Sequence, residues 1–445
     1  MYNKNSMKKN KTKYIVIAAV IAIAAAFLWS GRESSEYLAL VLPKSTTSLT
    51  AKKVFDENVS ANKKMQIEKV STDEYVKRKR AVRFNKEALT AKKSKITLDL
   101  FPDKSITAKL KSTKEKSPTN YIWKGQVEGD KLSTVTMTVK GDKITGIIRS
   151  SKGDFEIKSE GNGVHSIREI NYALFPRHVH LTPRRPAGIS ARAEAPPPRE
   201  VARVATIDIL VAYTQSALER LAGSVDELEN TADAYIEDAN VSFETSNILI
   251  RLNKVGSALA VDYRDTPNDI QTDYARLVEP RDGHMDNVHA ERDSRRADIV
   301  VLFMSGGTDA CGVGHQMNQD NWDFFDTRAF SAVRLGCLSG HALAHEIGHN
   351  LGAAHNREDA DHTPFQTYGY GYRTTSVRTI MSYPCVNDTC RILPIFSSAR
   401  TRFSNMQIGS ADMDNARAIN SVREIAANWR GGITIPKNFR NIPLR

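Results

Sequence analysis

Residues 340–355 read GHALAHEIGHNLGAAH, and this stretch carries the most specific prediction in the chain. His345 and His349 are four residues apart, so on a helix their side chains lie on one face, one turn apart. Two imidazoles on one face can bind the same cation at about 2.0–2.1 Å. Glu346 lies one step round the helix, where its carboxylate can act as a general base on a metal-bound water. The stretch therefore predicts a helix that carries part of a catalytic metal site.

The residues that follow complete this prediction. Gly352 can take the left-handed backbone conformation that ends a helix, so the chain can turn back and offer His355 as a third ligand. Three protein ligands plus a water are typical of catalytic rather than structural zinc sites. His341 lies in a Gly/Ser-rich helix start with no glutamate after it, and we exclude it as a ligand. The remaining late histidines lack such spacing and are expected in the surface or core: His284, His289, His315 and His362.

The motif HEIGHNLGAAH resembles that of the metzincin zinc endopeptidases, and it is most similar to the bacterial reprolysin-like group, which is related to the ADAM and snake-venom enzymes. Residues 379–383, Thr-Ile-Met-Ser-Tyr, resemble the methionine turn of that clan. The likeness covers about 203–430 and extends more weakly to 96–177, which resembles that group's propeptide. It implies an α/β (α+β) metzincin-type catalytic domain with a mixed twisted sheet and a long active-site helix, preceded by a β-rich propeptide domain.

The resemblance also implies roles for particular residues. Zn²⁺ would be bound by His345, His349 and His355, with Glu346 as the catalytic base and Met381 in the turn beneath them. Tyr383 matches a tyrosine that some metzincins place near zinc, although a packed core tyrosine is an equally good interpretation.

The sequence departs from the family pattern at several points. Asn356 stands where reprolysins usually have Asp after the third histidine, and Met406 stands where the bacterial group usually has proline. No cysteine precedes Cys311, so the chain lacks a cysteine switch. Any inhibition by the propeptide must therefore use another ligand or blockage of the cleft.

These observations predict an exported zinc endopeptidase that is made as a proenzyme and acts on proteins or peptides. Two alternatives stay open: a peptidase restricted to the amino side of Asp, which the resemblance allows, and an exported binding or adhesion protein that keeps zinc without turnover.

Charge is divided unevenly along the 445 residues, whose net charge is +12. Residues 1–200 carry 39 Lys and Arg against 20 Asp and Glu, whereas residues 201–445 carry 24 against 31. A hydrophobic content of 40% supports a sizeable core and excludes wholesale disorder. Because the second half is acidic, we expect no nucleic-acid partner for the mature domain.

All four cysteines lie late in the chain. An even number of cysteines in the C-terminal half favours two disulfides in an exported domain. Short loops close most easily, which favours Cys311–Cys337 and Cys385–Cys390. A four-cysteine zinc site or unpaired buried thiols are the alternatives.

The first 30 residues have the pattern of a targeting segment. Five lysines precede an uncharged run at 14–29, in the order of a signal peptide. We therefore assign 1–30 to a signal peptide, or to an N-terminal anchor if it is not cleaved. The protein is expected to be exported, secreted in the first instance and alternatively periplasmic or anchored, with membrane contact only through 14–29.

Residues 31–177 are assigned to the propeptide, which would act as an intramolecular inhibitor or chaperone. Residues 44–95 are rich in Lys, Ser, Thr and Glu, and the basic run at 77–80 is interpreted as a solvated charged face. From about 96, apolar and polar residues alternate between turn signals, which predicts antiparallel strands. The expected strands are 96–100, 121–127, 133–139, 144–148 and 155–158.

Residues 178–203 are rich in proline and arginine and are predicted to be a linker and processing region. The catalytic domain would follow at 204–432, with a tail at 433–445. Within it we expect strands at 204–213, 248–255, 297–304 and 329–334, and helices from Ser224 to about 243 and at 269–278.

Overall fold

The computed structural model describes residues 53–69, 75–185, 203–385, 390–403 and 405–431. These residues belong to one compact unit. The expected signal segment at 1–30 and the tail at 433–445 lie outside the described residues. Within the described ranges, no helix combines the length and apolar character needed to cross a membrane.

The N-terminal domain is a nine-stranded antiparallel sheet in the order β1-β2-β9-β8-β7-β6-β5-β4-β3. Its core is built from the alternating apolar side chains of these strands, with Trp123 fully buried at its centre. One short helix, α2 (Ala61–Glu68), packs beside β2. The strands are β1 (Phe55–Asp56), β2 (Val76–Phe84), β3 (Lys95–Phe101), β4 (Lys104–Ser117), β5 (Asn120–Val127), β6 (Thr134–Lys140), β7 (Lys143–Ser150), β8 (Gly153–Ser159) and β9 (Val164–Ile170).

All five strands expected in this domain are present, but the sheet begins before residue 96. Strand β2 contains the basic run, which forms ion pairs instead of a purely solvated face: Arg78 binds both Asp103 (2.9 Å) and Glu169 (2.8 Å). Its charged side chains interrupt the apolar alternation, so the sequence pattern gives no strand signal there. Strands β4 and β9 were missed for the same reason.

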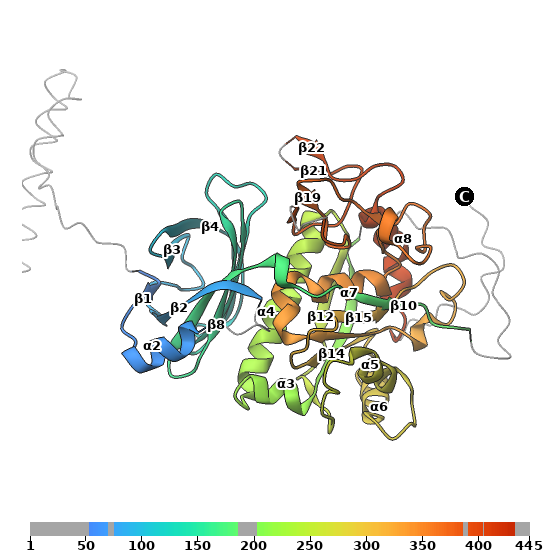
Figure 1. Ribbon diagram of the computed structural model, residues 1–445, viewed down its shortest axis with the longest axis horizontal. Coiled ribbons are helices and arrows are strands. Elements are labelled where there is room, and N and C mark those ends of the chain that lie inside the picture. Colours follow the sequence, from blue (N-terminus) through green and yellow to red (C-terminus); the bar gives the residue numbers. More distant parts are fainter. Residues whose placement is uncertain (1–52, 70–74, 186–202, 386–389, 404, 432–445) are drawn as a thin grey trace, which may run out of the picture. The chain divides into compact units, whose positions relative to one another are not determined.

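The second domain contains a mixed sheet in the order β10-β15-β16-β14-β11-β12, with β13 added beside β11. Figure 1 labels β10, β12, β14 and β15 of this sheet. Strands β11, β12, β14 and β16 are parallel, and β15 runs antiparallel to β16. The four expected strands correspond to β11 (Ala205–Tyr213), β12 (Ile250–Lys254), β14 (Ile299–Met304) and β16 (Phe330–Arg334). The others are β10 (Val179–Leu181), β13 (Leu259–Ala260) and β15 (Gly312–His315).

Helices cover this sheet. Ser224 Oγ accepts the Glu227 N–H at the start of α4 (Val225–Thr245), and Asp269 caps α5 (Ile270–Val278) in the same way, so both predicted helices are confirmed. The active-site helix α7 (Ala342–Asn350) has nine residues, so the long helix implied by the resemblance is not confirmed. The remaining helices are α3 (Gln215–Arg220), α6 (Asn287–Ser294), α8 (Asn415–Ala426) and the 3-10 turns η2 (Tyr172–Leu174), η3 (Phe325–Thr327), η4 (Leu335–Gly340) and η5 (Arg357–Asp359).

Short strand pairs and isolated bridges complete the C-terminal part of the described residues. Strand β17 pairs with β18, β19 with β20, and β21 with β22. Their bounds are β17 (Ala354–Asn356), β18 (Tyr370–Gly371), β19 (Val377–Arg378), β20 (Arg391–Ile392), β21 (Arg402–Phe403) and β22 (Met406–Gln407). Two isolated bridges, Arg373 with Arg378 and Ser410 with Met413, lie among them.

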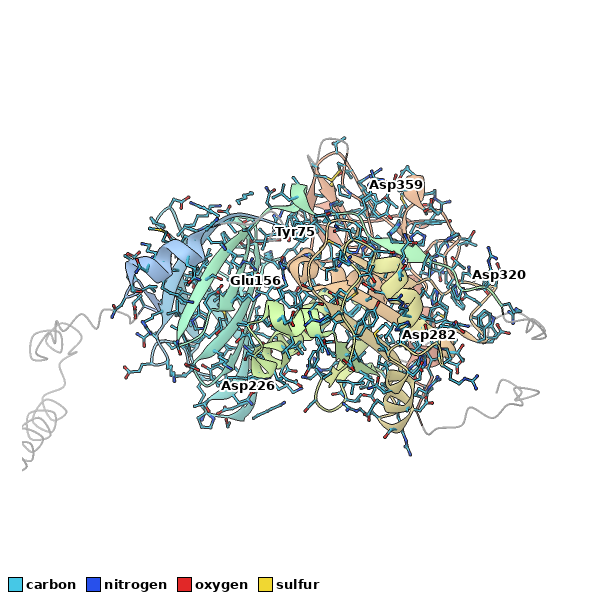
Figure 2. All side chains as sticks on the ribbon, turned by 60° about the horizontal axis from the view of Figure 1, so that its bottom comes forward. Tyr75, Glu156, Asp226, Asp282, Asp320 and Asp359 are labelled. Atoms are coloured by element: carbon cyan, nitrogen blue, oxygen red, sulfur yellow. A yellow bond between two sulfur atoms is a disulfide. The ribbon has the colours of Figure 1, made fainter. Side chains whose placement is uncertain are left out.

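The two domains contact each other through α4, which packs against β6 and β7. Polar contacts cross this interface: Tyr235 Oη donates to Glu156, Lys124 pairs with Glu237 (2.8 Å), and Tyr75 Oη donates to Gly307 O (2.7 Å). Figure 2 labels Tyr75 and Glu156. The N-terminal domain is thus fastened to the second domain by buried polar groups as well as by apolar packing.

The expected linker is only partly separate from the folded domains. Its residues 186–202 lie outside the described residues, but Val179–Leu181 form β10 and pair parallel with β15. This part of the segment is packed against the sheet, because its backbone N–H and C=O groups form hydrogen bonds with the edge strand β15.

Both predicted disulfides are confirmed, and no cysteine is free. Cys311–Cys337 joins the residue before β15 to η4, directly ahead of α7. Cys385–Cys390 closes a short loop after the methionine turn. Both bonds brace segments that border the metal motif.

Candidate active site

Three histidine nitrogens meet at one point beside α7. The Nε2 atoms of His345 and His349 lie 3.1 Å apart, and each lies 3.1 Å from His355 Nε2. The first two come from α7, one turn apart, and the third comes from β17 after the chain reverses. All three side chains are buried. This is the triangle that the motif spacing predicts.

The donor chemistry of this triangle fits a cation. His345 Nδ1–H donates to Ile380 O at 2.8 Å, and His349 Nδ1–H donates to Ala353 O at 2.9 Å. Each ring therefore carries its proton on Nδ1 and turns the lone pair of Nε2 inward. Lone pairs 3.1 Å apart repel one another unless a positive ion lies between them. Histidine nitrogens in this arrangement suit zinc at about 2.0–2.1 Å.

Burial sets the ionisation of these groups. It lowers the pKa of all three imidazoles well below the usual value, and it raises the pKa of Glu346 well above its own. The imidazoles are thus neutral at physiological pH, which is the form that binds metal. A buried carboxyl with a raised pKa is suited to take up and release a proton.

Glu346 is held in a narrow space between α7 and β15. A Cβ on Gly312 would lie 2.6 Å from Glu346 Oε1, and a Cβ on Gly314 would lie 3.1 Å from Oε2. Strand β15 can approach the carboxylate this closely only because it carries glycine at both positions. The strand therefore fixes where the carboxylate of Glu346 lies.

The turn and floor of the site come from Gly352 and Met381. Gly352 has φ +80°, and a Cβ there would meet Phe365 Cβ at 2.5 Å, so the reversal after α7 requires glycine. Met381 is fully buried, and a Cβ on Gly348 would lie 2.6 Å from its sulfur. The methionine thus packs against α7 at Gly348, the residue before His349.

Tyr383 lies beside the third histidine, with its ring centroid 4.0 Å from that of His355. Its hydroxyl donates to His178 O at 2.9 Å. Asn356 Oδ1 accepts the Tyr383 N–H at 3.0 Å. This hydrogen bond joins β17, the strand that carries His355, to the segment that follows Met381. His341 is buried at the start of α7 but does not belong to the triangle.

Sequence reasoning missed two residues of the site, His178 and His180. His178 Nδ1 lies 2.7 Å from Glu346 Oε1, and the His178 ring stacks on His345 with centroids 4.0 Å apart. The His180 ring lies 4.9 Å from that of His349 and 4.5 Å from that of His355. Both were assigned to a proline-rich linker. The available signal was their alternation, because residues two apart in a strand share a face.

Comparison with known proteins agrees with this geometry. Residues 203–415 match a family model described as metallo-peptidase family M12B, reprolysin-like, and residues 50–168 match a BamI lipocalin-like domain. Peptidyl-Asp metalloendopeptidase from Xanthomonas campestris is 28% identical over 67% of this chain and 70% of its own length. The protein of that name from Stenotrophomonas maltophilia is 27% identical over 69% and 77%.

A solved structure, metalloproteinase-II from Bacteroides fragilis, aligns with a TM-score of 0.33 and 14% identity over 68% of this chain and 88% of that one. The family match covers the domain that carries the histidine triangle. The domain at 203–415 matches the reprolysin-like metallopeptidases of family M12B, and the chain is a metalloendopeptidase.

Proposed function

We propose that the mature protein is an exported zinc endopeptidase in which His345, His349 and His355 hold the metal and Glu346 is the general base. The observation that carries this proposal is the triangle of Nε2 atoms 3.1 Å apart with a buried carboxylate on the same helix. Such a donor set leaves a position for water, as catalytic sites require.

When bound there, zinc supplies a Lewis acid for the scissile carbonyl and for the attacking water. Glu346 accepts the proton of that water on a carboxylate oxygen and afterwards gives it to the leaving amine. Strand β15 keeps the carboxylate in place through Gly312 and Gly314, and Met381 supports the helix from below. Burial excludes bulk water and raises the pKa of Glu346, which favours proton uptake.

Replacement of the base tests this assignment. Glu346→Ala should keep the fold and bound zinc but lower casein hydrolysis by about 100-fold or more. Zinc content and circular dichroism measured on the same preparation serve as controls. Wild-type activity in the purified variant would refute the role of Glu346.

We further propose that the enzyme cleaves on the amino side of Asp. Its support is the name of the curated relatives, peptidyl-Asp metalloendopeptidase, at 27–28% identity. A proteome digested by the mature form should give peptides that begin with Asp. Peptides with no preference at that position would instead support a broad endopeptidase, and absence of chelator-sensitive cleavage would support a zinc-retaining binding protein.

The chain is proposed to be made as a proenzyme, with residues 1–30 directing export and the N-terminal domain acting as propeptide. Support comes from the lysines before the apolar run at 14–29 and from the arginine-rich segment before the catalytic domain. N-terminal sequencing of the active form should place its start within 184–204. Activity confined to the uncut chain would contradict this.

A further inference from the structure

A segment that overlaps the start of the expected linker and processing region crosses the candidate active site. Strand β10 pairs in parallel with β15, with His180 opposite Gly314. Hydrogen bonds flank the pairing: the Cys311 N–H donates to Arg177 O at 3.1 Å, and the Gln316 N–H donates to Leu181 O at 2.7 Å. The segment is therefore held along its length by the same strand that positions Glu346.

Downstream, the segment is held by a charged contact. Arg185 forms a two-pronged ion pair with Asp323, with distances of 3.0 and 2.8 Å. Tyr383 holds the upstream end through the carbonyl of His178. Residues 177–185, here called the blocking segment, are thus anchored on both sides of the histidine triangle.

The blocking segment directs two imidazoles into the site. His178 and His180 are two residues apart, so in an extended chain they share a face. His178 reaches the carboxylate of Glu346. His180 offers a ring nitrogen within 4.8 Å of ligand atoms of both His349 and His355. Among the described residues, none forms a hydrogen bond with the His180 ring.

We propose that His180 is a fourth nitrogen ligand of the zinc in the uncut chain, while His178 holds the carboxylate of Glu346 in a hydrogen bond. This inference rests on the proposed function. Nitrogens bound to one tetrahedral zinc lie about 3.3 Å apart, so a small side-chain rotation brings His180 from its present position to the metal. Four protein ligands make a closed site of the structural type, with no position for water. The base is blocked at the same time.

Hydrolysis of one peptide bond after the blocking segment would release this arrangement. Before the cut, His180 belongs to the same chain as its partners and binds with a high effective concentration. After the cut, the segment is attached only to the N-terminal domain and can leave with it. Water then takes the position vacated by the His180 nitrogen. The chain thus uses histidines in place of the absent cysteine switch.

X-ray absorption at the zinc K-edge of the uncut chain tests the proposal, because the scattering from imidazole rings shows how many of them are bound to the zinc. The uncut wild type should show four imidazoles, and the cut, mature form should show three. His180→Ala in the uncut chain should show three. His362→Ala is the matched control and should keep four, although its ring lies 5.2 Å from that of His180.

Activity gives a second measurement on the same samples, with mass spectrometry verifying that the chain is uncut. His180→Ala should raise chelator-sensitive hydrolysis of a short peptide by the uncut chain about tenfold or more. Three imidazoles in the uncut wild type, with an active mature form, would overturn this inference and leave the proposed function intact. Failure of both forms to bind zinc would overturn both. The comparison of the wild type before and after cleavage does not depend on whether the His180→Ala variant folds.

Discussion

Arg149 in β7 and Asp238 in α4 form a buried ion pair across the domain interface, with Nη2 and Oδ2 3.0 Å apart. Both side chains are almost completely enclosed, at 1% and 5% exposure. Arg149 Nη1 also donates to Ser339 O at 2.6 Å, in the turn that leads into α7. One guanidinium from the N-terminal domain therefore contacts both the long helix α4 and the approach to the active-site helix.

Removal of one partner of this pair should destabilise the uncut chain strongly. Arg149→Met leaves the Asp238 carboxylate buried without its cation, at a cost of about 3–5 kcal/mol in the free energy of unfolding. Chemical denaturation followed by tryptophan fluorescence measures the loss. The double variant Arg149→Met/Asp238→Leu should recover part of it, because the Asp238 charge is removed together with its cation. The recovery stays partial because the buried Asp154, 3.7 Å from Arg149, still loses that partner. Equal stability of the single variant and wild type would contradict the prediction.

A methyl group at Gly312 should displace the general base. In Gly312→Ala the new Cβ would lie 2.6 Å from Glu346 Oε1, so the carboxylate must move. A shift of about 1 Å lowers kcat by about 100-fold, with a smaller change in KM. Gly431→Ala is the control, since its nearest neighbour is 3.4 Å away. Unchanged kcat in Gly312→Ala would show that β15 does not position Glu346.

Glu227 should make stability depend on pH. Burial raises its pKa to about 7, and one of its carboxylate oxygens has no hydrogen-bond partner. Because the folded pKa exceeds the unfolded value, its contribution is present below about pH 4.5 and is lost as pH rises toward 7. Glu227→Gln should therefore stabilise the uncut chain by about 2 kcal/mol at pH 8 and have little effect at pH 4.5. Denaturation at both pH values measures this, and an equal effect at both would refute it.

The two disulfides should contribute unequally. Cys311–Cys337 spans 26 residues and Cys385–Cys390 spans 5, so the first restricts the unfolded chain more. Replacing both cysteines of a pair by alanine should cost about 3.5 kcal/mol for the first and about 2 kcal/mol for the second. Thermal unfolding of the two double variants, compared side by side, measures the difference. A larger loss from the shorter loop would contradict the loop-entropy explanation.

Local sequence patterns predicted much of the fold. The strands β11, β12, β14 and β16 and the caps of α4 and α5 are visible as periodicity and capping residues, which act over a few neighbours. Strand β2 was missed because ion pairs with Asp103 and Glu169, far along the chain, stabilise its charged side chains. A pattern within one segment contains no information about such partners.

The same division holds at the site. The sequence by itself determined the histidine triangle, because a helical spacing of four and a glycine reversal are local geometry. Only the tertiary structure decided that His178 and His180 face that triangle and that Gly312 lies against Glu346. These contacts join segments more than 30 residues apart through sheet pairing, and the order of strands in a sheet depends on packing of the whole domain.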